Sequence, residues 1–240
     1  MAIVTGGGRG IGRAIALGYA RAGADVIISV ARNRAEADAV VEESHSLPGT
    51  VVAAQADVTV SGDVDRLVER ALSHSGRIDV LVNNAARGMR FVNERFMSEP
   101  LPFWESDPEA WRMVIETNIV GVFLTSRAVV PHMLAAGRGS IVNVTINRQT
   151  MVRRGFSPYG PSKAALEAMT EVWAQELDGT GVVINLLLPG GATATGMVPD
   201  DVPDHDELLS PEIVVPGALH LAVTERSGQR IVGTEWAEPG

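Results

Sequence analysis

Apolar residues along the chain follow two kinds of pattern. Seven short stretches are almost uninterruptedly apolar: residues 2–4, 25–30, 51–54, 78–82, 140–144, 182–188 and 230–232. Between them, apolar residues recur at helical spacing, as at Ile11, Ile15 and Tyr19. Strands with continuous rather than alternating hydrophobicity are typical of a parallel sheet that is covered on both faces. The pattern therefore predicts an α/β fold.

The segments between the predicted strands set the topology. Helices are predicted at residues 11–22, 35–44, 63–73, 109–135, 159–177 and 214–223. Strands that alternate with helices favour a doubly wound, mostly parallel seven-stranded sheet with helices on both faces. A chain of 240 residues is long enough for one such domain. We expect a single domain over residues 1–240.

The turn between the first strand and the first helix is rich in glycine and reads TGGGRGIG over residues 5–12. Gly6 can turn the chain sharply because glycine tolerates positive φ. Gly10 and Gly12 leave room for the backbone to approach a phosphate and for the helix to pack on the strand. The helix, which begins near Ile11, directs unpaired N–H groups toward an anion. These features are those of a Rossmann-type dinucleotide site, although the glycines alone equally fit an ordinary strand-to-helix turn.

Composition excludes several other classes of function. A net charge of −9 argues against a nucleic-acid partner or an anionic membrane surface. The chain has no cysteine, and its five histidines are scattered, so we expect no metal site. No apolar run looks long enough to span a bilayer and no signal peptide is recognisable, so we expect a cytoplasmic protein.

Two segments interrupt the regular alternation of strands and helices. Residues 87–108 carry several arginines and aromatic residues where a tight connection is expected. Such long loops are commonly functional, so this one is interpreted as a wall of a substrate pocket; an oligomer contact or a surface insertion are the alternatives. Residues 192–212 include an acidic stretch, Asp200 to Glu207, which we interpret as a solvated lid rather than a metal site.

Several short motifs occur together and in a fixed order. Beside the glycine turn they are Asp57, Asn83-Asn84-Ala85, Asn118, Tyr159-Gly-Pro-Ser-Lys163 and Pro189-Gly190. In these motifs the chain resembles the short-chain dehydrogenase/reductase family, classical type, over essentially its whole length. The resemblance implies an oxidoreductase that interconverts a carbonyl and an alcohol on a small organic substrate. It also implies a homodimer or homotetramer joined through the helices that bear Asn118 and Tyr159.

The pair Tyr159 and Lys163 carries the predicted chemistry. The two residues are four apart, so they share one face of a helix. An unperturbed tyrosine has a pKa of about 10, and a neighbouring ammonium together with an oxidised nicotinamide favours the phenolate. Such a tyrosine can donate a proton to a carbonyl oxygen or accept one in the reverse direction. The resemblance implies that Lys163 also binds the nicotinamide ribose and that Asn118 holds a water in a proton relay.

One position departs from the family pattern. The family places a catalytic serine after the fifth strand, and a gapless count back from Tyr159 puts Ile146 in that column. Isoleucine has no donor, and losing one oxyanion donor typically costs about 3–4 kcal/mol of barrier. Either Thr145 or Asn147 could supply the donor if the loop shifts by one residue. We hypothesise that Asn147 does so, because its amide reaches further.

The choice of cofactor depends on charge at the end of the second strand. Relatives that prefer NAD place an acidic residue there, but this chain has Val30, followed by Arg32 and Asn33. Arg9 lies inside the glycine turn, and arginine suits a 2′-phosphate because its planar fork binds phosphate oxygens in pairs. We therefore expect NADP(H) rather than NAD(H), with solvated surface arginines as the alternative interpretation.

The resemblance assigns the remaining cofactor contacts. Asp57 and Val58 match the family's adenine contact, and Asn84 and Ala85 match the neighbourhood of the adenosine ribose. Pro189 and Gly190 precede the nicotinamide carboxamide site, for which the candidates are Thr193 and Thr195.

Two other functions stay open at this point. Because Ile146 weakens the expected oxyanion site, an enzyme of this fold could instead reduce imines, dehydrate a substrate or assist a cyclisation. Alternatively, the chain could be a non-catalytic protein that binds NADPH.

Overall fold

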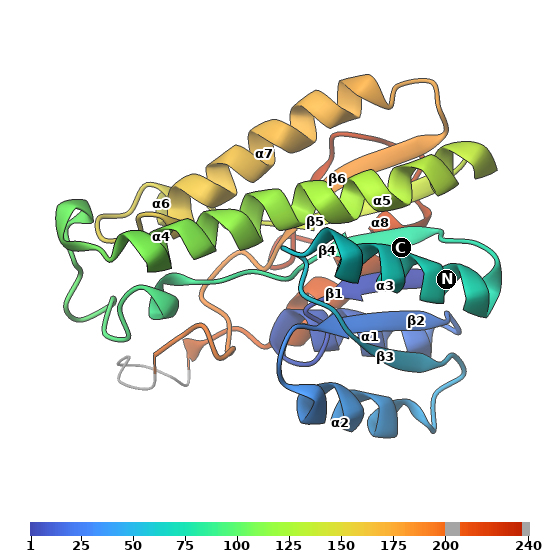
Figure 1. Cartoon of the computed structure of the whole chain (residues 1–240), viewed down its shortest axis with the longest axis horizontal. Coiled ribbons are helices and arrows are strands. Elements are labelled where there is room, and N and C mark those ends of the chain that lie inside the picture. The colour runs from blue at the N-terminus through green and yellow to red at the C-terminus, as the bar shows by residue number, and fades with distance from the viewer. Residues whose placement is uncertain (200–206, 237–240) are drawn as a thin grey trace.

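The computed structural model describes residues 1–199 and 207–236. Its core is a seven-stranded sheet in the order β3-β2-β1-β4-β5-β6-β7, and every neighbouring pair is parallel (Figure 1). The strands are β1 (Ala2–Thr5), β2 (Val26–Val30), β3 (Val51–Gln55), β4 (Val80–Asn83), β5 (Gly139–Val144), β6 (Val182–Leu188) and β7 (Arg230–Val232). The predicted α/β, doubly wound fold class is confirmed.

Helices cover both faces of this sheet. One face packs against α1 (Gly10–Arg21), α2 (Arg34–Ser44) and α8 (Val215–Val223). The other face packs against α3 (Ser61–Ser75), α5 (Gly121–Ala136) and α7 (Tyr159–Glu176). Figure 1 shows α5 and α7 crossing the sheet on the side away from α1 and α2.

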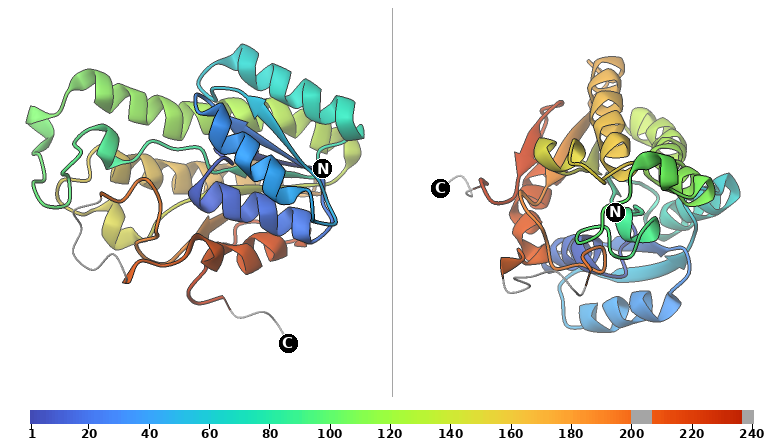
Figure 2. Two further views of the ribbon diagram at one scale, coloured as in Figure 1. Left: turned by 90° about the horizontal axis from the view of Figure 1, so that it is seen from below. Right: turned by 90° about the vertical axis from the view of Figure 1, so that its left-hand side faces the viewer.

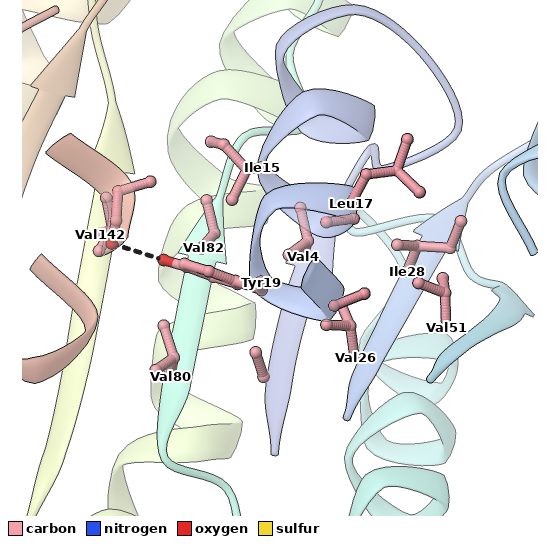
Figure 3. Packing of buried hydrophobic residues seen from close by; sticks show 14 of the residues in the cluster. Val4, Ile15, Leu17, Tyr19, Val26, Ile28, Val51, Val80, Val82 and Val142 are labelled. Carbon is pink, nitrogen blue, oxygen red and sulfur yellow. Dashed lines mark hydrogen bonds between the residues drawn. The ribbon is translucent and has the colours of Figure 1, made fainter. Parts of the chain in front are cut away.

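Alternation along each buried strand separates two hydrophobic cores. Val4 and Ile28 point to the α1 face, whereas Ile3 and Ile27 on the same strands point to the α3 face. Figure 3 shows the first core, in which the Tyr19 hydroxyl of α1 donates a hydrogen bond to a carbonyl oxygen of α8, that of Ala218, at 3.0 Å. Because both strand faces are apolar, the sheet is stable only when both are covered.

The helix predicted at residues 109–135 is continuous but not uniform. It consists of α4 (Pro108–Ile115), a π-helical turn (Glu116–Val120) and α5. By length and composition alone, Pro108–Ala136 would be long enough to cross a membrane, a test that core helices also pass. In the fold, α5 packs against α3 and β4, while Val120, Phe123 and Leu134 remain exposed.

The carboxyl ends of the strands carry the irregular segments. Residues 87–108 contain two short 3-10 turns, and a one-turn helix that was not predicted, α6 (Arg148–Met151), follows β5. Figure 2 (right) shows these two segments and the chain that follows β6 at the same end of the molecule. Residues 200–206 lie outside the described residues, and most of the predicted acidic lid falls on them.

Candidate active site

The Asn84 side chain helps to hold the glycine turn against the end of β4. The Asn84 amide nitrogen donates to the carbonyl oxygens of Thr5 at 2.9 Å and Gly6 at 3.0 Å. Gly6 and Gly10 adopt φ values of 64° and 53°, which favour glycine. A Cβ on Gly12 would lie 2.4 Å from the Asn84 amide nitrogen, so only glycine allows this close packing.

A cleft of about 510 Å³ opens beside this turn. Most of the predicted cofactor residues line it: Gly6, Arg9, Gly10, Ile11, Arg32, Asn33, Asp57, Val58, Asn84, Ala85 and Thr195. Gly12 lies behind the turn, against Asn84. Ser29, which sequence analysis did not identify, also lines the cleft; its hydroxyl is buried and has no hydrogen-bond partner in the described part of the chain.

Cations gather at the adenine end predicted for this cleft. Burial alone would raise the pKa of Asp57. Hydrogen bonds from Thr59 and the charges of Arg87 and Arg32 outweigh burial, so the pKa of Asp57 is lowered. Arg87 was not predicted as a cofactor residue; its guanidinium lies 4.8 Å from the centre of the Phe91 ring. Its only sequence signal is its position shortly after the Asn-Asn-Ala motif.

A second cavity, of about 210 Å³, adjoins the cleft. The two share lining residues, among them Ile11, Asn84 and Thr195, so they form one continuous depression. The second cavity contains the remaining predicted site residues except Asn118: Asn147, Tyr159, Lys163, Pro189, Gly190 and Thr193. The structure thus brings the glycine turn and the Tyr159–Lys163 pair to one edge of the sheet.

Without cofactor, burial shifts the pKa values of both Lys163 and Tyr159. The Lys163 ammonium donates to the carbonyl oxygen of Val144 at 2.7 Å, and burial lowers the pKa of Lys163 to about 8. Burial raises the pKa of Tyr159 to about 12. The expected lowering by a neighbouring cation is therefore outweighed by burial, because desolvation disfavours the phenolate. Within the described chain, the Tyr159 hydroxyl has no hydrogen-bond partner.

Asn118 lies in the π-helical turn and is completely buried. Its amide nitrogen donates to the Ser162 hydroxyl at 2.9 Å and to the carbonyl oxygen of Arg87 at 3.0 Å. Its amide oxygen accepts from the Arg87 N–H at 2.8 Å. Asn118 thus joins α7 to the segment after β4, and it is not among the described residues that line either cavity.

The segment after β5 determines which side chain can replace the missing serine. The Thr145 hydroxyl is buried and donates to the Glu167 carboxylate at 3.1 Å, so it is already engaged. The Asn147 amide oxygen accepts from the Thr150 N–H at 2.9 Å and caps α6, which leaves the amide N–H groups of Asn147 for another partner. Ile146 lines the cavity, where its side chain offers no donor.

Comparison with known proteins agrees with this geometry. A family model described as short chain dehydrogenase matches residues 1–206. The chain belongs to the short-chain dehydrogenase/reductase family. Family membership makes it an oxidoreductase that acts on CH–OH or C=O groups with NAD(P).

Two similar sequences and one similar structure illustrate how this short-chain dehydrogenase/reductase relates to known proteins. The chain is 37% identical to a 3-oxoacyl-(acyl-carrier-protein) reductase of Synechocystis over 79% of this chain and 73% of the relative. It is 36% identical to a Thermotoga maritima protein of the same name, over 78% and 72%. A metagenomic short-chain oxidoreductase solved in complex with NADP superposes with a TM-score of 0.80 at 27% identity, covering 96% of this chain and 94% of the other.

The residues of the cleft suit the cofactor that this family binds. Added Cβ atoms at Gly6 and Gly12 would lie 2.9 Å and 2.4 Å from neighbouring atoms, so these positions keep the backbone within reach of a diphosphate. The buried Ser29 hydroxyl lacks a partner that a dinucleotide could supply. Arg9 and Arg32 provide positive charge at the same cleft, which Asp57 and Glu36 also line; Glu36 lies 3.4 Å from Arg9.

Proposed function

We propose that this oxidoreductase reduces a ketone or aldehyde on a small organic molecule with NADPH, or runs the reverse alcohol oxidation. One observation carries this proposal: Tyr159 and Lys163 line a cavity that is continuous with the cleft at the glycine turn. A dinucleotide whose diphosphate lies at the turn can therefore extend its nicotinamide toward the Tyr159 hydroxyl.

The chain's own residues move and hold the proton. The bound cofactor supplies hydride to the carbonyl carbon. Tyr159 donates its hydroxyl proton to the carbonyl oxygen, and Lys163, while it is an ammonium, favours the phenolate that remains. Because burial lowers the pKa of Lys163 to about 8, the residue is still mostly protonated at neutral pH. Asn118 takes part in returning a proton to this pair through a water, as the family resemblance implies.

The developing oxyanion receives a second donor from Asn147 in this proposal. The helix cap fixes the Asn147 amide oxygen on the Thr150 N–H, so the amide N–H groups have a defined direction. Thr145 is the weaker candidate because its hydroxyl already donates to Glu167.

NADP(H) is proposed over NAD(H) because Val30 stands where NAD-binding relatives have an acidic residue, and Arg32 and Arg9 add positive charge beside it. Arg32 follows the end of β2 and lines the cleft, and its side chain has no ion-pair partner in the described chain. Arg9 is 68% exposed and bound only at 3.4 Å to Glu36, so it can turn to a 2′-phosphate.

A homodimer or homotetramer in the cytoplasm completes the proposal. Large apolar side chains are exposed along the helices of one face: Trp111, Val120, Phe123, Leu134 and Val172. Such a surface favours association, since contiguous apolar patches commonly mark interfaces. These side chains belong to α4, the π-helical turn, α5 and α7, the helices that the family resemblance places in the interface.

The test is a carbonyl panel read by loss of reduced-nicotinamide absorbance. Purified protein is supplied with NADPH or NADH and with ketones, aldehydes, quinones and imines. We expect consumption of NADPH with at least one carbonyl compound, faster than with NADH. Tight NADPH binding without turnover of any compound would contradict the proposal and favour a binding protein, and turnover of imines alone would favour the atypical chemistry.

A further inference from the structure

The cavity beside Tyr159 has strongly apolar walls. Apolar and aromatic side chains line most of it, among them Met89, Phe96, Met97, Phe156, Met197 and Leu208. Phe96 and Phe156 contact each other edge to face with their ring centres 5.3 Å apart, and both are buried. These walls suit an apolar substrate body.

Arg153 is a charged residue in this mostly apolar cavity. Among the described lining residues, Arg153 and Lys163 are the charged ones, and none is a carboxylate. Lys163 is already bound to the carbonyl oxygen of Val144. Among its described lining residues the cavity thus has two cations and no anion, in a chain whose net charge is −9. Its charge is therefore complementary to an anionic ligand.

The guanidinium of Arg153 is positioned without being neutralised. It lies 5.1 Å from the centre of the Phe156 ring, a cation–π contact with a buried aromatic side chain. Arg153 forms no ion pair in the described chain, and its backbone N–H donates to Thr150. An arginine held on a ring keeps its N–H edge for the paired oxygens of a carboxylate.

Arg153 does not belong to the cofactor cleft. It lines the cavity that holds Tyr159 and is absent from the lining of the cleft at the glycine turn, where Arg9 and Arg32 lie. Arg154, its neighbour in sequence, is exposed like Arg153 but lines neither space. The two adjacent arginines therefore form a natural pair of test and control positions.

We propose that Arg153 binds a carboxylate of the carbonyl substrate, so that the enzyme acts on apolar oxo acids rather than on neutral carbonyl compounds. This inference rests on the proposed carbonyl reduction. It makes Arg153 a specificity-determining residue: it selects the substrate through charge, while Phe96 and Phe156 contact the apolar body.

The experiment compares oxo acids with their neutral esters. Levulinate and its two next longer straight-chain homologues, each beside its methyl ester, are offered to the wild-type enzyme and to Arg153→Gln, Arg153→Lys and Arg154→Gln. We expect the wild type to prefer at least one acid over its ester. Arg153→Gln should lower kcat/KM for that acid roughly 10- to 100-fold, mainly through KM, because a charged hydrogen bond is lost. It should leave the ester within about twofold.

The variants separate specificity from a structural effect. Arg153→Lys keeps the charge without the planar fork and should fall between wild type and Arg153→Gln, whereas Arg154→Gln should match wild type. Ester turnover equal to or faster than acid turnover in the wild type at every chain length would overturn the inference. So would equal losses for acid and ester in both Arg153 variants.

Failure of this inference can be told from failure of the proposed function. If esters and other neutral carbonyls are reduced without regard to Arg153, carbonyl reduction stands and the carboxylate site does not. If nothing is reduced, calorimetry of hexanoate against hexanamide with the NADPH-loaded enzyme still decides. Hexanoate should bind more tightly and lose that advantage in Arg153→Gln; equal binding of both probes would overturn the inference.

Discussion

The cofactor cleft and the substrate cavity share an edge of the sheet but are built differently. The cleft lies around closely packed strand ends: the Thr5 side-chain hydroxyl accepts N–H groups of Asn84 at 3.0 Å and Ala85 at 3.1 Å, which joins β1 to β4. The substrate cavity is formed by side chains from three segments outside the strands, after β4, β5 and β6. The tightly packed glycine positions of the cleft tolerate few residue types, whereas the side chains that line the cavity can vary with the substrate.

This difference separates positions that the fold itself requires from positions that can change with the substrate. Glycine is required where a Cβ would lie 2.4 Å from another atom, whatever the substrate. At the cavity, Ile146, Asn147 and Arg153 could each be exchanged without disturbing the sheet. The substitutions that follow therefore affect chemistry at the cavity and cofactor selection at the cleft.

The largest effect is expected for Tyr159→Phe. Loss of the proton donor should lower kcat by roughly 10²- to 10⁴-fold. Because the hydroxyl has no partner in the described chain, the melting temperature should not fall, and NADPH should still bind at the cleft. Steady-state kinetics and fluorescence titration with NADPH measure the two properties. A variant that retains more than half of the wild-type kcat would show that another group transfers the proton.

Asn147 provides a sharper test, because its two ends have separate roles. Asn147→Ala removes both the cap and the donor, whereas Asn147→Asp keeps an oxygen for the Thr150 N–H and removes the amide donor. Both should lower kcat by about 10²- to 10³-fold. Only Asn147→Ala should also lose about 1 kcal/mol of unfolding free energy. Unchanged turnover in both variants would mean that Asn147 is a helix cap alone.

Lys163 links the cavity to the stability of the ligand-free protein. Its pKa is about 8 in the folded chain against 10.5 in its unperturbed state. Between these values the unfolded chain binds a proton that the folded chain does not, so stability rises with pH. Relative to Lys163→Met, wild type should gain about 2 kcal/mol from pH 7 to about pH 9.5. Urea unfolding at several pH values measures this difference, and parallel curves for the two proteins would refute it.

The smallest effect concerns cofactor preference. Arg32→Gln should raise KM for NADPH about tenfold and change KM for NADH little, because one charged contact to the 2′-phosphate is lost. Arg34→Gln is the matched control, since Arg34 pairs with Asp38 at 2.7 Å and does not line the cleft. Equal changes for both cofactors in Arg32→Gln would remove Arg32 from 2′-phosphate recognition.

The fold could be predicted from local pattern because its strands are buried on both faces. The run at residues 182–188 is apolar except for Asn185 and forms β6 with the predicted bounds. The glycines predicted a tight strand-to-helix turn, but only the motifs further along the chain favoured a dinucleotide site there. Tyr159 and Lys163 were predicted from the family motifs around them, because a spacing of four residues on a helix is by itself common at surfaces.

Other features have no local signature. The π-helical turn at Glu116–Val120 differs from an α-helix in its hydrogen-bond pattern, and nothing in its sequence distinguishes it from the helix on either side. The one-turn helix α6 is too short for periodicity to indicate it. The role proposed for Arg153 depends on Phe96 and Met197, which are distant from it in sequence and line the same cavity. Side-chain convergence of this kind depends on tertiary packing.

The most direct test is a crystal structure of the protein with NADP. The diphosphate should lie at the glycine turn, the 2′-phosphate near Arg32, and the nicotinamide ring between Pro189 and the Tyr159 hydroxyl. A dinucleotide bound in any other place would contradict the account. So would a nicotinamide ring so far from the Tyr159 hydroxyl that one substrate could not contact both.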